Sequence, residues 1–113
     1  MIPEGFPAEW EAAWNAHDLD RIMSHYAEGV VFRSRKAQAL VGTGELHGRA
    51  ALRGYWSEAL SRQPDLRFEV LEVFEGHSTL ALRYRNHRGV IAVETLRFES
   101  DGLVVEASAC HSA

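Results

Sequence analysis

Residues 66–111 read LRFEVLEVFEGHSTLALRYRNHRGVIAVETLRFESDGLVVEASACH, and polar and apolar side chains alternate along most of this stretch. Turn-forming residues interrupt the alternation at 76–77, 87–89 and 101–102. A period of two is typical of strands that have one apolar and one wetter face. The stretch therefore predicts four consecutive antiparallel strands, at about 66–75, 78–86, 90–99 and 103–111.

The first half of the chain follows the helical period instead. One apolar stripe is formed by Phe6, Trp10, Ala13 and Trp14; a second starts after the potential N-cap Asp18 and contains Leu19, Ile22, Met23 and Tyr26, ending at Gly29. We expect a strand at 30–34, a loop at 35–47 and a third helix at about 48–62. The predicted fold class is α+β, with three helices covering the apolar face of the sheet.

The composition limits the range of functions. The chain has 113 residues, with 12 Lys and Arg against 16 Asp and Glu, and a net charge of −4. This size suits a single domain over residues 1–113, and the acidic balance argues against nucleic-acid and anionic-membrane partners. The single cysteine, Cys110, excludes an intrachain disulfide, and no stretch resembles a signal peptide or a membrane span. We expect a soluble, cytoplasmic protein.

Metals and cofactors are not expected. The six histidines show no His-x-His pattern and no i,i+4 pair, and none has a nearby cysteine partner. Gly42-Thr43-Gly44 lacks the strand-turn-helix context and the following lysine of a phosphate-binding loop.

Four short motifs run through the chain: WNAHDLD at 14–20, YAEGVVF at 26–32, GRAALRGYW at 48–56 and ETLRF at 94–98. Their order and spacing resemble the SnoaL-like and ketosteroid-isomerase-like branch of the nuclear-transport-factor-2-like superfamily, over about residues 7–111. The resemblance implies a strongly curved sheet wrapped into a cone and closed by the helices around a deep pocket. It also implies a homodimer formed through the outer face of the sheet.

The resemblance can be tested residue by residue. In ketosteroid isomerases, an Asp base ends the first strand, and a Tyr of the first helix and a protonated Asp of a late strand hold the oxyanion. The corresponding positions here fall on Ser34, Trp10 and Glu94. An unactivated serine cannot take up a proton at neutral pH, and an indole N–H is a weaker acid than a phenol. Steroid isomerisation by that mechanism is therefore not expected, and an epoxide-hydrolase-like Asp-Arg-Asp arrangement lacks its Asp residues.

Glu94 is the acidic residue that we expect to face the pocket. If Val90, Ala92, Leu96 and Phe98 face inward, the period of two places Glu94 inward among them. A desolvated carboxyl would act as a general acid or base near neutrality, and His111 on the next strand is its candidate partner. In the alternative register, Glu94 pairs with an arginine at the rim. His111 can equally be part of a frayed terminus.

Aromatic residues fall on the inward stripes. The candidate ligand-binding set is Trp10, Trp14, Tyr26, Phe32, Trp56 and Tyr84, with an apolar small molecule as the ligand. The same residues can instead fill the core, because aromatic side chains dominate both cores and ligand sites. A cavity of several hundred Å³ containing the Glu94 carboxyl would favour ligand binding. A cone filled with side chains would favour a non-catalytic binding or dimerisation module.

The outward positions of the strands carry charge. We expect cross-strand ion pairs of Arg67, Arg83, Arg85 and Arg97 with Glu69 and Glu75 on the outer face of the sheet. Leu71 and Val73 lie among these charges and leave apolar surface for a dimer contact.

Overall fold

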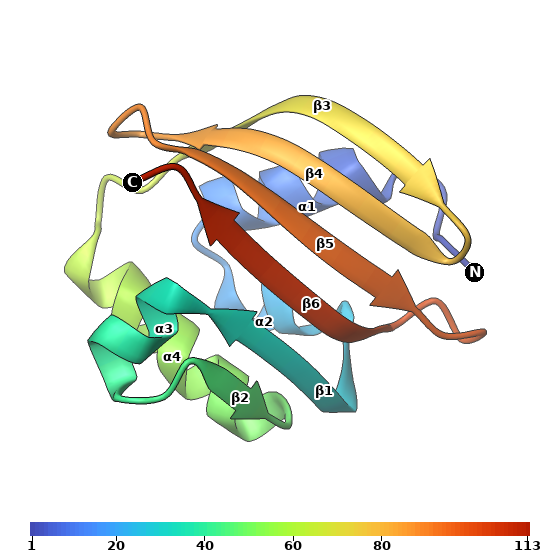
Figure 1. Ribbon diagram of the computed structural model, residues 1–113, viewed down its shortest axis with the longest axis horizontal. Helices are drawn as coiled ribbons and strands as arrows, with labels where there is room; N and C mark the ends of the chain where they lie inside the picture. Colours follow the sequence, from blue (N-terminus) through green and yellow to red (C-terminus); the bar gives the residue numbers. More distant parts are fainter.

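The computed structural model describes all residues, 1–113, and forms a curved six-stranded sheet with four helices (Figure 1). The elements are α1 (Phe6–Asn15), α2 (Leu19–Met23), β1 (Tyr26–Ser34), α3 (Arg35–Val41), β2 (Glu45–His47), α4 (Arg49–Arg62), β3 (Phe68–Gly76), β4 (Thr79–Asn86), β5 (Ile91–Phe98) and β6 (Val104–His111). The predicted α+β class is confirmed.

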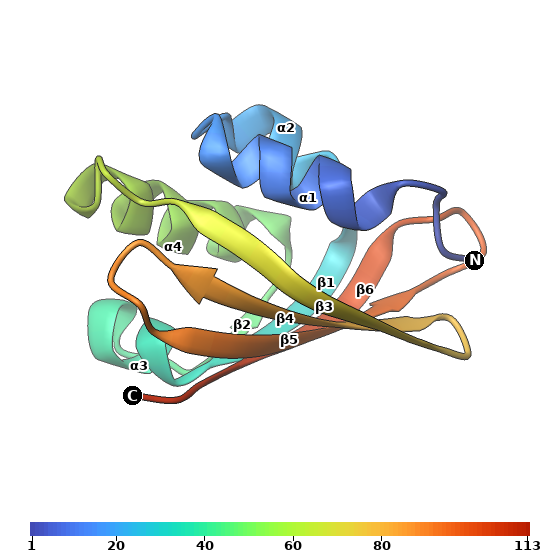
Figure 2. The ribbon, with the colours of Figure 1, turned by 90° about the horizontal axis from the view of Figure 1, so that it is seen from above.

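The strand order in the sheet is β2-β1-β6-β5-β4-β3. All neighbouring strands are antiparallel except β1 and β6, which run parallel. Helices α1, α2 and α4 lie over one face of the sheet, whereas α3 lies at the end where β1 stops (Figure 2). The sheet stays open, because its edge strands β2 and β3 do not pair with each other.

The predicted alternation of the late strands is confirmed. Leu80, Leu82 and Tyr84 of β4 are buried, as are Ala92, Glu94, Leu96 and Phe98 of β5. The cross-strand partners Leu82 and Glu94 therefore face the helices together. Glu94 is thus held among the core residues by the register of the sheet.

The motif at 14–20 fixes the turn between α1 and α2. The Asn15 side chain exchanges two hydrogen bonds with the backbone of Phe68: its Nδ2 donates to the carbonyl at 2.9 Å, and its Oδ1 accepts from the N–H at 2.7 Å. His17 Nε2 donates to the Leu66 carbonyl at 2.7 Å. Asp18 caps α2 by accepting from the Arg21 N–H. These residues join the helical hairpin to β3, so their role is structural.

The expectation of a loop at 35–47 is wrong. Ser34 Oγ accepts the Lys36 N–H and caps α3, and Gly42 ends this helix at a φ of 85°. Residues 45–47 then pair antiparallel with β1. A seven-residue helix followed by a three-residue strand is too short for its periodicity to show in the sequence.

The second helix also ends earlier than expected. It stops at Met23, and Tyr26, which we placed on its apolar stripe, begins β1 and pairs with Val104 of β6. Tyr26 is buried, as is Ile22. The apolar stripe therefore predicted the burial of the Tyr26 side chain correctly, although the Tyr26 backbone is extended and not helical. Gly29 lies inside β1, where the register against β6 shifts.

The outer face carries cross-strand ion pairs, but only the pair of Arg85 with Glu69 has an expected acidic partner. Arg83 contacts Glu72 at 3.2 Å, Arg85 contacts Glu69 at 3.5 Å, and Arg97 contacts Glu106 at 3.8 Å. Arg67 and Glu75 form no ion pair within 4 Å, contrary to expectation.

The register of β3 changes which apolar side chain points outward. Leu71 is the extra residue of a bulge that shifts the register between Val70 and Glu72. Val73 consequently lies opposite the buried Leu82, on the concave side, and Phe74 takes the outward position with 54% of its surface exposed. The expected Leu71 and Val73 pair is corrected to Phe74, together with the 38% exposed Val93 of β5.

The longest helix, α4, has 14 residues, and no helix has the length and apolar character that crossing a membrane requires.

Candidate active site

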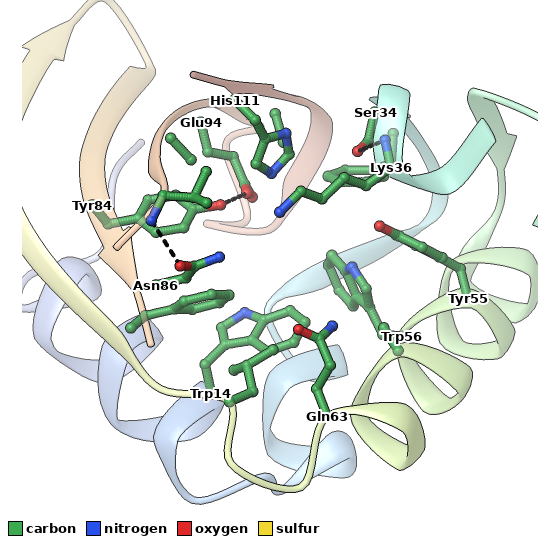
Figure 3. Close-up of a pocket in the computed structure, with 17 residues that line it drawn as sticks. Trp14, Ser34, Lys36, Tyr55, Trp56, Gln63, Tyr84, Asn86, Glu94 and His111 are labelled. Carbon is green, nitrogen blue, oxygen red and sulfur yellow. Dashed lines mark hydrogen bonds between the residues drawn. The ribbon is translucent and has the colours of Figure 1, made fainter. Parts of the chain in front are cut away.

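A cavity opens between the concave face of the sheet and α4, at the end of the molecule where α3 lies (Figure 3). Of its 17 lining residues, 11 are hydrophobic. Its polar wall residues are Ser34, Lys36, Gln63, Asn86, Glu94 and His111. The space available to the centres of water-sized molecules is about 70 Å³, within about 610 Å³ of atom-free space that includes the open mouth. The volume of this cavity is smaller than that of an ordinary ligand pocket but larger than the void that holds one buried water.

The Glu94 carboxyl lies in the inner wall of this cavity. The residue is only 4% exposed, and its Oε1 accepts a hydrogen bond from the Tyr84 hydroxyl at 3.2 Å. No cation pairs with it. Burial raises the pKa of Glu94 from 4.5 to about 7, against a smaller lowering by the Tyr84 hydrogen bond. The group therefore exchanges protons near neutral pH, as general acid–base chemistry requires.

Three tyrosines surround this carboxyl. Burial raises the pKa of Tyr84, Tyr26 and Tyr55, and the Glu94 carboxylate raises each of them further. Their hydroxyls consequently remain protonated at neutral pH. They can donate hydrogen bonds to an oxygen that gains negative charge, but they cannot act as bases.

His111 lines the same cavity from β6. Ala92 is its cross-strand partner and Ala109 is that of Glu94, so the two candidate residues lie on adjacent strands and are offset by two positions. No hydrogen bond or ion pair joins them directly, and the hydrogen-bond partner of Glu94 is Tyr84. Burial lowers the pKa of His111 to about 4, assisted by Lys36 and Arg35. His111 is therefore neutral at physiological pH, and its buried Nδ1 has no hydrogen-bond partner.

The predicted aromatic residues form two layers. Trp14, Phe32, Trp56 and Tyr84 line the cavity. Trp10 and Tyr26 do not line it: they pack behind it, with ring centroids 4.9 Å from Tyr84 and 5.0 Å from Trp56, respectively. Trp10 lies one layer deeper because α1 carries it against the sheet, where it also stacks on Phe68 at 5.4 Å.

Some wall residues were not among the sequence candidates, and Lys36 is the most notable. It belongs to α3, a helix that the sequence pattern did not reveal, and its side chain points into the cavity (Figure 3). Asn86 and Gln63 also line the mouth. One signal was available: Lys36 is the single lysine among eleven arginines, and it follows Ser34 by two residues.

Ser34 occupies the end of β1, as the resemblance implied for the position of the isomerase base. Its Oγ accepts the Lys36 N–H at 3.1 Å and caps α3. The hydroxyl therefore fixes the position of a neighbouring helix and has no adjacent base to activate it.

The structure contains no cluster of three or more His, Cys, Asp or Glu side chains that could hold a metal ion. A wider, open groove of about 680 Å³ runs along the surface beside β3 and β4. Its walls are charged or polar except for one apolar residue; they comprise Glu11, Asp65, Arg67, Phe68, Glu69, Arg85, Asn86 and His87. It offers no apolar wall comparable to that of the cavity around Glu94.

Comparisons with known proteins agree with this architecture. No curated protein sequence matches the chain. A SnoaL-like protein of unknown function from Burkholderia thailandensis is 41% identical and superimposes with a TM-score of 0.92, covering 96% of this chain and 92% of that one. AclR from Streptomyces galilaeus, described as a "putative hydroxylase", is 27% identical with a TM-score of 0.77, covering 96% and 87%.

A "putative polyketide cyclase" from Sinorhizobium meliloti is 16% identical, with a TM-score of 0.79 and coverage of 96% and 95%, and shares the fold. The SnoaL-like domain family itself matches residues 8–107. With this match over most of its length, the chain belongs to the SnoaL-like domain family.

Proposed function

We propose that this protein binds a small carbonyl compound with an apolar body in the cavity and that Glu94 transfers a proton to or from it. One observation carries the proposal: a carboxyl group is buried among aromatic rings without a cation, so that its pKa lies near 7. A structural carboxylate would be expected to pair with a charge or with several N–H groups. Cofactor-independent isomerisation, cyclisation or dehydration is the corresponding class of reaction.

The proposed step begins with the ionised form of Glu94. Its carboxylate takes a proton from the carbon next to the substrate carbonyl, and the electrons of that C–H bond form the enolate. The protonated hydroxyl of Tyr55, which lines the cavity and does not donate to Glu94, can donate to the enolate oxygen. The proton returns from Glu94 to another carbon or leaves with a hydroxyl group. Neutral His111 on the adjacent strand is the proposed partner of Glu94, and its unpaired Nδ1 is available to hydrogen-bond a group in the cavity.

Hydrogen–deuterium exchange tests the proposal. Exchange of the α-protons of 1-indanone in D₂O is followed by NMR with wild-type protein, with Glu94→Gln and with Glu69→Gln, an exposed carboxylate of β3. We expect exchange above the buffer rate for wild type and Glu69→Gln, and its loss in Glu94→Gln. Equal exchange by wild type and Glu94→Gln would exclude Glu94 as the proton acceptor.

A non-catalytic binding module is the second candidate, and the narrow cavity favours it. With Trp10 and Tyr26 packed behind the wall, much of the cone is already filled. Mass spectrometry of metabolites captured by wild type and by Glu94→Gln separates the candidates. A captured ligand that wild type leaves unchanged over time would favour binding alone.

We further propose a homodimer through the outer face of the sheet. Phe74 and Val93 are exposed there, among ion pairs of Arg with Glu. A surface with interspersed Arg and Glu complements a second copy of itself better than it complements a polyanion.

A cytoplasmic location is proposed from the cysteine content. Cys110, the single cysteine, is free and exposed on β6, which suits a reducing compartment. Cell fractionation with an antibody against the chain tests this location.

A further inference from the structure

Three N–H donors around the mouth of the cavity have no acceptor. The first is the ammonium of Lys36, which forms no ion pair and points into the cavity (Figure 3). The second is the amide nitrogen of Asn86: the oxygen of this side chain already accepts the Arg88 and Val90 N–H groups at 2.9 Å, which fixes the amide and leaves its Nδ2 free. The third is Trp14 Nε1, which is buried without a partner in a residue 5% exposed.

An indole N–H and an ammonium are donors only, so protein rearrangement among these groups cannot satisfy them. Of the three, Trp14 Nε1 is the buried one, and leaving a buried donor without a partner costs free energy that is recovered when an acceptor enters the cavity. The donors come from α1, α3 and β4, which are far apart in the sequence. A ligand that supplies oxygen acceptors therefore matches these three donors.

The electrostatics of the mouth favour an anion. Burial lowers the pKa of Lys36, and repulsion by Arg88 and Arg35 lowers it further. Glu94 is the only acidic residue of the wall, and it bonds to Tyr84. The mouth thus carries positive charge without a carboxylate partner, in a chain whose net charge is −4. A negative ligand group would offset this repulsion.

We propose that Lys36, Asn86 and Trp14 form a carboxylate subsite, so that the ligand of this cavity is a small carboxylic acid with an aromatic or other apolar body. The inference rests on the proposed function in using the same cavity, and it specifies the ligand class. A planar carboxylate has two oxygens that accept hydrogen bonds from several directions. It can therefore bond to donors that approach from three separate elements. Partial negative charge on Glu94 also repels the ligand carboxylate, which orients the carbonyl end of the ligand inward.

The test compares an acid with its neutral isostere. Uniformly ¹⁵N-labelled protein is titrated with trans-cinnamate and, separately, with trans-cinnamamide, and the indole Nε1–H signal of Trp14 is followed. The variant Trp14→Phe assigns this signal. We expect cinnamate to bind at least tenfold more tightly than cinnamamide at low salt, and the preference to fall as salt rises.

Variants test whether the preference for cinnamate over cinnamamide depends on Lys36. Lys36→Met should bind both probes equally, because the cation is gone, whereas Lys36→Arg should retain most of the preference. Arg67→Met is the matched control: it removes one positive charge that forms no ion pair and lies outside the cavity wall, and it should bind like wild type. Well-dispersed ¹⁵N spectra confirm that each variant is folded.

The outcomes separate this inference from the proposed function. Equal binding of the two probes to wild type, with movement of the Trp14 signal, would show that the cavity takes ligands and would overturn the carboxylate subsite. A preference retained in Lys36→Met would overturn it as well. If neither probe moves the Trp14 signal, the cavity does not bind ligands of this size. That result would exclude both the carboxylate subsite and the proposed function for this class of compound.

Discussion

The charge on Glu94 couples the proposed chemistry to the stability of the protein. Burial raises the pKa of Glu94 to about 7 in the folded state, against 4.5 in an accessible carboxyl. Below pH 4.5 the group is protonated in both states, so burial of its charge has no cost. Between pH 4.5 and 7 the unfolded state releases this proton while the folded state keeps it, so stability falls as the pH rises and the loss is complete above pH 7, where the folded state buries the ionised form.

We therefore predict that Glu94→Gln stabilises the protein in a pH-dependent manner. The free energy of unfolding of the variant should match that of wild type near pH 4.5 and exceed it by about 3 kcal/mol above pH 7, from about 1.4 kcal/mol per pKa unit. Urea unfolding at a series of pH values measures the difference. The exposed Glu69→Gln serves as the control, and a difference independent of pH would contradict the burial argument.

Tyr84 sets how far the pKa of Glu94 rises. Its hydroxyl donates to Glu94 Oε1 and favours the ionised form. Tyr84→Phe should therefore raise the pKa of Glu94 further, as measured by the pH dependence of the ¹³C shift of the Glu94 carboxyl carbon. Tyr55→Phe, which removes a phenol without a hydrogen bond to Glu94, should shift the pKa less. An unchanged or lower pKa in Tyr84→Phe would be inconsistent with the observed hydrogen bond.

The sequence predicted some of the wall residues and missed others for identifiable reasons. Glu94 follows from strand alternation, because a period of two assigns every side chain of a strand to one face. Lys36 does not follow, since its direction depends on a seven-residue helix that begins where β1 ends. Trp10 and Trp14 share one apolar stripe, yet one packs behind the wall and the other lines it. Periodicity reports a buried face and does not distinguish layers within it.

Among the elements, α3 links the fold to the proposed carboxylate subsite. Ser34 caps this helix and Gly42 terminates it, so these two residues determine where Lys36 lies. We predict that Ser34→Ala destabilises the protein by about 1 kcal/mol, the ordinary cost of a lost N-cap. It should also weaken cinnamate binding, because the first turn of α3 is no longer held.

Urea unfolding and the cinnamate titration measure the two effects of Ser34→Ala. Ser61→Ala provides the comparison: it removes an exposed serine hydroxyl of α4 that donates to the Glu58 carbonyl. Equal stability losses in Ser34→Ala and Ser61→Ala would show that the cap does not stabilise α3.

Long elements were predictable from sequence, and short or irregular ones were not. The four late strands and α4 were predicted to within about three residues at each end, because several periods of alternation or helical spacing support each of them. The bulge at Leu71 was not predictable, since one extra residue leaves the polar and apolar pattern nearly unchanged while it reverses the faces that follow. The outward Phe74 is the result.

For the molecule as a whole, the outer sheet face makes the proposed dimer testable. Light scattering after size-exclusion chromatography should show a dimer for wild type at micromolar concentration and a monomer for Phe74→Lys, which replaces the most exposed aromatic side chain of this face by a charge. Val41→Lys is the control, because Val41 is 42% exposed but belongs to α3. A monomeric wild type, or a dimer that survives Phe74→Lys, would exclude this interface.

The position of β6 determines when the sheet can form during folding. This last strand of the chain lies between β1 and β5, and its parallel pairing with β1 joins residues about 75 positions apart. Until β6 is in place, β1 and β2 have no connection to the β3-β4-β5 meander, so the sheet consists of two separate pieces with exposed edges. Such long-range closure slows folding and leaves a nascent chain without a continuous sheet until β6 has been synthesised. Synthesis of residues 1–103 alone would accordingly yield two unjoined sheet fragments that are prone to associate with other chains through their edges.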